Sequence, residues 1–288
     1  MKTKAFLISL AVFLFALILI VSVSLRKKAG DSEDVSYSTE SSVGILDTIV
    51  YDDVISEPIY DNMPDGVYYK KITKRTVLNT ENGSRIVYNY PSFEGFEGLN
   101  TDNDINSLIV SYIKKKQKSS AEGFYKLIES GAKAVYEISD FEITYADFSL
   151  ISIVFDGYYD INDENSHIDT GASSVKYSLN IDIANMKILT SEQLISSFTS
   201  LKSRFVGGDM LFESGAEELL DIASLDDLFF QYKAEYEIYP DIYFTEDNVK
   251  IIILLTSDLG GDAVFSDNIN EAREYIYADM PALSSLFS

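Results

Sequence analysis

The chain opens with an apolar run that differs from everything after it. Residues 5–25 carry no charge, and basic residues flank them on both sides. At about 1.5 Å per residue, a helix of this length spans roughly 30 Å, the thickness of the hydrocarbon core of a bilayer. The pattern predicts a transmembrane helix within a membrane anchor over residues 1–28. A cleaved signal peptide is the alternative.

The next segment, residues 29–66, is polar at first and is later broken by proline and glycine. Residues 31–42 are rich in Ser and acidic side chains and have little to bury. Residues 43–55 include a short apolar piece. We expect a stalk or linker over residues 29–66, and the sequence leaves open whether the apolar piece adds a strand to the domain that follows.

From residue 67 the pattern becomes that of strands. Residues 67–78 and 84–90 are β-rich, and the segment between them ends in Asn82-Gly83, a strong hairpin signal. We expect Pro91 to stop the second strand, because proline cannot donate a hydrogen bond to a strand ladder.

The clearest helix of the sequence begins at Thr101, which with Asp104 resembles a capping box. The apolar residues that follow have the spacing of one helical face: Ile105, Leu108, Ile109, Tyr112 and Ile113. Gly123 leaves open whether this helix continues to Gly131.

The remaining chain alternates β-rich runs with helical patterns. Strands are expected at residues 133–146, 150–159, 174–183, 241–245 and 249–256. Helices are expected at residues 191–202, behind a capping box of Thr190 and Gln193, at residues 216–236, and from Asp267 toward Pro281. This order lacks regular βαβ alternation. It predicts an α+β fold of antiparallel sheets with packed helices, in two halves at residues 67–187 and 188–288.

The composition excludes several classes of partner and of catalytic or metal site. The chain has 46 acidic and 23 basic side chains, one histidine and no cysteine. Five of the basic residues and none of the acids precede residue 29, so the remainder carries a formal charge of −28. Such acidity excludes nucleic acid as a partner, the lack of cysteine excludes thiol chemistry, and a single histidine excludes two-histidine metal motifs. We expect no cofactor and no metal.

The candidate contact residues are Tyr158, Tyr159 and His167. His167 lies in a polar loop rich in carboxylates, and the two tyrosines end the strand before that loop. Tyrosine offers a rigid amphipathic surface for recognition. The alternatives are a turn-stabilising histidine and tyrosines that half-fill a sheet. The loop departs from a calcium-binding pattern, because Asn165 stands where that pattern needs glycine.

Several short motifs follow one another in the order of a known family. They are Tyr88-Asn89-Tyr90-Pro91, Asp104-Ile105-Asn106, residues 150–155 and residues 177–182. Over residues 67–269 the chain resembles the tandem extracellular domain shared by the RsiV-type membrane anti-sigma factor and the non-catalytic N-terminal part of PdaC-type peptidoglycan deacetylases. The resemblance implies an extracytoplasmic binding domain whose ligand is a cationic wall-acting protein such as lysozyme, or a wall glycan of the peptidoglycan.

Two loops depart from that family. The loop around His167 keeps only the histidine of the usual Gly-Gly-Ala-His, and residues 256–261 replace a usual Tyr-Glu-Ile turn. The ligand is therefore not carried over from the family.

We expect a non-catalytic, single-pass protein of the cell membrane with its bulk outside the cytoplasm, or a secreted one if the segment is cleaved. An accessory envelope protein without a soluble ligand and a carboxylate-dependent hydrolase are the alternatives. Anti-sigma function is not expected, because only four residues precede the apolar run.

Overall fold

The computed structural model describes residues 49–50, 54–79, 81–96, 101–129, 132–163, 168–169, 172–215, 223–255 and 261–288. They all belong to one compact unit, Asp47–Ser288. The predicted anchor, most of the predicted stalk and His167 lie outside these residues. None of the helices found within them is both long and apolar enough to cross a membrane.

In the described residues, nine strands form a large sheet in the order β1-β3-β4-β5-β6-β8-β9, with β2 on β3 and β7 on β6. Their bounds are β1 (Ile49–Val50), β2 (Val54–Ile55), β3 (Tyr68–Asn79), β4 (Ser84–Glu94), β5 (Lys133–Ala146), β6 (Leu150–Asp163), β7 (Ile168–Asp169), β8 (Ser173–Asp182) and β9 (Lys187–Leu189). β4 and β5 pair in parallel, and the other pairs are antiparallel. The large sheet thus contains the predicted hairpin, now β3 and β4.

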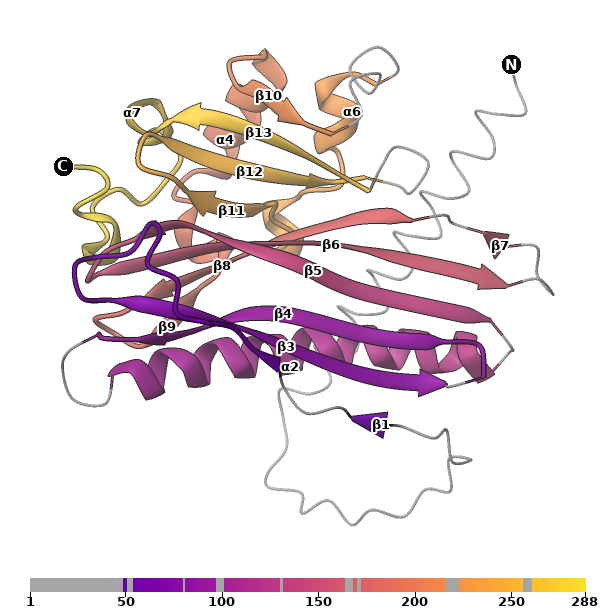
Figure 1. Ribbon diagram of the computed structural model, residues 1–288. Coiled ribbons are helices and arrows are strands. Elements are labelled where there is room, and N and C mark those ends of the chain that lie inside the picture. Colours follow the sequence, from indigo (N-terminus) through magenta and orange to yellow (C-terminus); the bar gives the residue numbers. More distant parts are fainter. Residues whose placement is uncertain are drawn as a thin grey trace, which may run out of the picture. The chain divides into compact units, whose positions relative to one another are not determined.

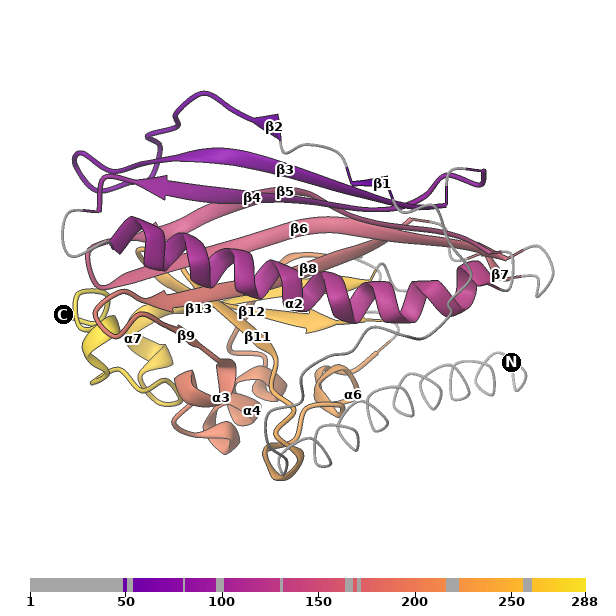
Figure 2. The same ribbon diagram turned by 90° about the horizontal axis from the view of Figure 1, so that it is seen from below.

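The parallel pair exists because a helix returns the chain from the end of β4 to the start of β5. This helix, α2 (Thr101–Glu129), lies along one face of the large sheet (Figure 2). Ile105, Ile109 and Ile113 are at most 2% exposed, which confirms the predicted apolar stripe. The helix continues through Gly123.

A second sheet packs on the opposite face of the large sheet (Figure 1). Its order is β10-β13-β12-β11, with bounds β10 (Leu211–Ser214), β11 (Asp241–Phe244), β12 (Asn248–Leu254) and β13 (Asp262–Asn268). Val154 of β6 meets Tyr243, Ile252 and Val264 between the two sheets. The other face of the second sheet packs against short helices: α3 (Ser191–Leu194), α4 (Phe198–Gly207), α6 (Leu225–Phe229), α7 (Ile269–Ala272) and η3 (Pro281–Leu283). A further short helix, η1 (Ala234–Tyr236), has no buried residue.

The expected α+β fold with mainly antiparallel sheets is confirmed, but Pro91 does not end its strand. β4 runs on to Glu94, and Pro91 pairs with Lys71. Both backbone groups of Phe93 bond to Asn106 and so point away from β3. Residues two apart in a strand orient their backbone groups alike, so the missing N–H of Pro91 faces the same open edge and removes no ladder bond.

Two of the predicted long helices are wrong in their extent. Residues 191–202 form two short helices, because Ser197 starts α4 anew by accepting a hydrogen bond from the Ser200 amide. Asp267 lies in β13 rather than at a helix start, since its strand pairs in register with Val249.

The third predicted helix, residues 216–236, is also shorter where it is described. Residues 216–222 lie outside the described part, and after them Ser224 caps the five-residue helix α6, which ends at Phe229.

β1 and β2 lie in the apolar piece of residues 43–55, for which the sequence left open whether it adds a strand to the domain. Both strands pair with β3. The division into halves at residues 67–187 and 188–288 stays a prediction.

Candidate functional site

Tyr158 and Tyr159, predicted to form one contact patch, lie on opposite faces of the large sheet. They are successive residues of β6, and side chains alternate along a strand. Tyr158 stands opposite Ser174, whose hydroxyl donates to Asp262 of the second sheet at 2.5 Å. Tyr159 stands opposite Tyr136, on the face that α2 covers. The structure therefore does not bring the two tyrosines together, and His167 is outside the described residues.

Tyr158 belongs to a small polar cluster on the face that carries the second sheet. Its hydroxyl donates to Glu137 Oε2 at 3.2 Å, and Arg85 Nη2 lies 3.3 Å from the same oxygen. Burial, followed by the charge of Glu137, raises the pKa of Tyr158. The tyrosine is therefore a neutral hydrogen-bonding group beside a carboxylate that already has a cation partner.

Three carboxylates occupy the same face next to this cluster. Asp156 precedes Tyr158 by two residues and stands directly opposite Asp140 of β5, while Glu142 stands opposite Val154. We call Asp140, Glu142 and Asp156 the acidic ledge. The side chains of Asp140 and Asp156 are 69% and 52% exposed.

Two lysines partly neutralise the acidic ledge. Lys71 Nζ lies 2.9 Å from Asp140, and Lys176 Nζ lies 3.0 Å from Asp156. Like charges directly opposite each other in a sheet are destabilising, and these pairs offset that repulsion. No ion pair of Glu142 is found among the described residues.

Tyr243 of β11 lies where the second sheet meets the acidic ledge. It is 8% exposed and packs against Val154. Burial raises the pKa of Tyr243, and so do the charges of the carboxylates around it: Glu213, Glu142, Asp156 and Asp262. Its hydroxyl therefore stays neutral at physiological pH. Lys250, opposite Tyr243 on β12, forms an ion pair with Glu213.

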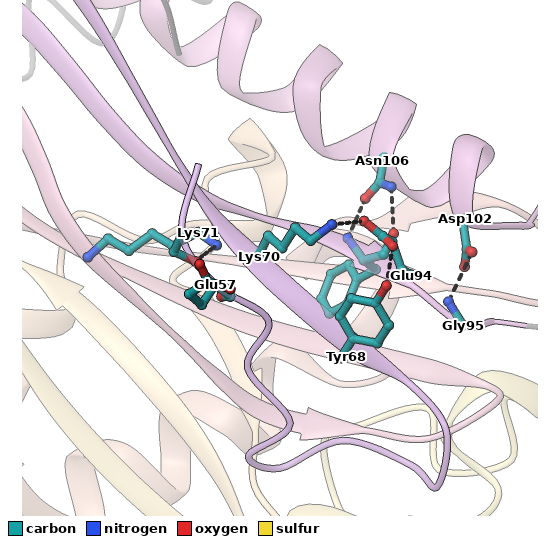
Figure 3. A network of polar contacts seen from close by, with 10 residues as sticks. Glu57, Tyr68, Lys70, Lys71, Glu94, Gly95, Asp102 and Asn106 are labelled. Atoms are coloured by element: carbon teal, nitrogen blue, oxygen red, sulfur yellow. Dashed lines mark hydrogen bonds and ion pairs between the residues drawn. The ribbon is translucent and has the colours of Figure 1, made fainter. Parts of the chain in front are cut away.

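A separate polar network lies at the open end of the β3–β4 hairpin (Figure 3). Glu94 accepts a hydrogen bond from the Tyr68 hydroxyl and lies 2.6 Å from Lys70 Nζ. Hydrogen bonding, first from Lys70 and then from Tyr68, lowers the pKa of Glu94. The ring of Tyr60, 63% exposed, lies 5.3 Å from the ring of Tyr68. This end of the hairpin thus presents two aromatic rings above a satisfied ion pair.

The asparagines of the motifs behind the family resemblance have structural contacts. Asn106 bonds to the backbone of Phe93 (Figure 3), Asn89 Nδ2 donates to the carbonyls of Ile138 and Ser139, and Asn180 Nδ2 donates to the carbonyl of Ile242. These three asparagines therefore help to hold the fold together.

The sequence analysis did not predict the acidic ledge. Carboxylates are too numerous in this chain to single out three of them, and the register between β5 and β6 is the signal that joins them. Across the described ranges, no group of three or more His, Cys, Asp or Glu residues is placed to hold a metal ion.

Among known proteins, only solved structures show similarity to this chain. No family model matches the chain, and no curated protein matches it. Its structure is similar to that of a DUF3298 family member from Bacteroides fragilis, with 11% sequence identity, a TM-score of 0.40 and coverage of 83% of this chain and 96% of that one. It is also similar to a DUF3298 family protein from Pseudomonas aeruginosa, with 8% identity, a TM-score of 0.42 and coverage of 77% and 97%. The resemblance to the RsiV- and PdaC-type domain remains a prediction.

Proposed function

We propose that the chain is a membrane-anchored, extracytoplasmic and non-catalytic domain that binds a basic protein of the cell envelope, such as a lysozyme-like protein. The observation that carries the proposal is the acidic ledge, where Asp140 and Asp156 stand directly opposite each other and remain exposed. Lys71 and Lys176 offset part of the repulsion between these two carboxylates, and Glu142 beside them has no ion pair among the described residues. A cationic partner would compensate the negative charge that remains on the ledge.

The charge of the whole chain beyond the anchor supports the same partner. A formal charge of −28 on residues 29–288 attracts a basic protein over distances comparable to the Debye length, and it repels anionic polymers. Complementary charge of this kind mainly raises association rates and selects against wrong partners.

The test is binding of lysozyme to the full-length chain in detergent micelles. We expect saturable binding at physiological salt that strengthens as salt is lowered, because exposed charges are screened less at low ionic strength. The control is an unrelated acidic protein of equal net charge. Retention of lysozyme no better than by this control, or no retention at low salt, contradicts the proposal.

A wall glycan is the second candidate ligand, favoured by the exposed ring of Tyr60 beside that of Tyr68. Binding of soluble peptidoglycan fragments would then be nearly insensitive to salt and lost on Tyr60→Ala, but kept on Tyr277→Ala, which removes another exposed tyrosine. Binding of neither lysozyme nor glycan favours the accessory envelope role.

A further inference from the structure

The hydroxyl of Tyr243 is a polar group with no hydrogen-bond partner in the part of the chain that the structure describes. Tyr243 is only 8% exposed, but its hydroxyl is not among the buried polar atoms that lack a partner, so the small exposed part of the side chain includes the hydroxyl. Its ring packs on Val154 of β6, the residue opposite Glu142 of β5. The side chain is thus held between the two sheets, with the acidic ledge beside it.

The carboxylates around Tyr243 differ in whether they already have an ion-pair or hydrogen-bond partner. Glu213 is paired with Lys250, Asp156 lies 3.0 Å from Lys176, and Asp262 accepts a hydrogen bond from Ser174. Glu142 is exposed and has neither an ion pair nor a hydrogen bond within the described ranges. One neutral hydroxyl and one carboxylate therefore remain available, and Val154 links them, because it packs against Tyr243 and stands opposite Glu142.

These two groups complement a nitrogen cation. A tyrosine oxygen and a carboxylate both accept hydrogen bonds from an ammonium or a guanidinium group, and hydrogen bonds of this charge-assisted kind are the strong ones. A metal ion fits less well, because no three carboxylates of the described residues are grouped closely enough to coordinate one.

We infer that Tyr243 and Glu142 form a subsite that receives a lysine or arginine side chain of a basic protein partner. The inference rests on the proposed function and gives it a location, at the junction of β5, β6 and β11. The remaining acids of the ledge supply attraction over longer distances, and the two free groups supply the direct contact.

The test compares variants of the full-length chain in detergent micelles, with lysozyme as the probe at physiological salt. We expect Tyr243→Phe and Glu142→Gln each to raise Kd about tenfold, as loss of one charge-assisted hydrogen bond does. The double variant should lose less than the product of the two effects, because both groups bind one cation. Tyr243→Phe should leave the unfolding midpoint unchanged or higher, since its hydroxyl has no partner to lose.

The matched control is Glu81→Gln, which removes the same charge from the exposed β3–β4 turn. It should change Kd by less than about twofold at physiological salt, where distant exposed charges are screened. If Glu142→Gln weakens binding no more than Glu81→Gln, or Tyr243→Phe binds as tightly as the unmodified chain, the subsite is wrong and the proposed function stands. If the unmodified chain does not bind lysozyme, both fail.

Discussion

Asn106 binds both backbone polar groups of Phe93. Its Oδ1 accepts from the Phe93 N–H at 2.7 Å, and its Nδ2 donates to the Phe93 carbonyl at 2.8 Å. The pairing of β4 with β5 ends at Tyr88, so the backbone of β4 beyond that point has an open edge. The carboxamide takes the place of a neighbouring strand and fixes the first turns of α2 to the sheet.

Replacing Asn106 by Ala should therefore destabilise the fold. The substitution removes two hydrogen bonds and leaves part-buried backbone groups unpaired, which costs about 1–3 kcal/mol. Thermal and urea unfolding of the full-length chain measure the loss. Asn103→Ala is the control, because Asn103 is exposed on the same helix, and it should be neutral or slightly stabilising. Equal midpoints for the two variants would show that the Phe93 contact contributes nothing.

A second prediction concerns the place where the β12–β13 connection meets β8. Gly261 has φ of +92°, and a Cβ there would lie 2.3 Å from the Ser174 carbonyl oxygen. Gly83 has φ of +74° but open space around it. Gly83→Ala should thus cost about 1 kcal/mol from backbone strain alone, whereas Gly261→Ala adds overpacking and should cost about 3 kcal/mol or more. Unfolding midpoints give the order, and a reversed order would mean that the loop moves freely off β8.

How far the sequence predicts this fold is clearest in β5. Its bounds, residues 133–146, are confirmed, because β-rich composition and flanking turns locate a strand well. The register was not readable, since a bulge between Ile138 and Asp140 shifts the alternation by one residue. That shift puts Asp140 and Glu142 on the same face as Glu137. The acidic ledge is therefore a product of tertiary pairing.

Among the helices, the local pattern predicts the long one correctly and fails for a short pair. The stripe of α2 was predicted because it repeats over several turns with a capping signal at its start. Between residues 191 and 202 the local pattern also favours a helix, but Ser196 N donates to the Tyr275 carbonyl, a contact distant in sequence that breaks the helix. Tyr158 and Tyr159 lie on opposite faces for a simpler reason, since adjacent residues of a strand alternate between its faces, and their role in binding stays a prediction.

A third prediction tests the bulge that builds the acidic ledge. A Cβ on Gly157 would lie 2.0 Å from the Glu137 carbonyl oxygen, so glycine is required opposite Ile138, where the β5 bulge begins. Gly157→Ala should cost about 3 kcal/mol through overpacking of backbone. Gly207→Ala in α4 is the control, because its Cβ would meet only the end of the Asp209 side chain, at 3.2 Å. Circular dichroism melting curves distinguish the two, and a Gly157→Ala midpoint equal to that of the control would contradict the bulge geometry.

A fourth prediction follows from Asp262, which is 5% exposed where the two sheets meet. Burial is the main cause that raises its pKa, and the hydrogen bond from Ser174 acts in the opposite direction. A carboxyl whose pKa is raised on folding costs no stability at pH values below its unfolded pKa of about 4, and it becomes destabilising as the pH rises through the folded pKa. Asp262→Asn keeps an oxygen that accepts from Ser174 and removes the charge.

The variant should therefore match the unmodified chain near pH 3 and unfold at a higher temperature at pH 7, with the gap opening as pH rises. Asp279→Asn, at an exposed position, should show no gap at either pH. The measurement is the melting temperature of both variants and of the unmodified chain between pH 3 and pH 7. A lower melting temperature for Asp262→Asn at pH 7 would mean that the ionised carboxylate stabilises the junction through Lys176 and Ser174 more than its burial destabilises it.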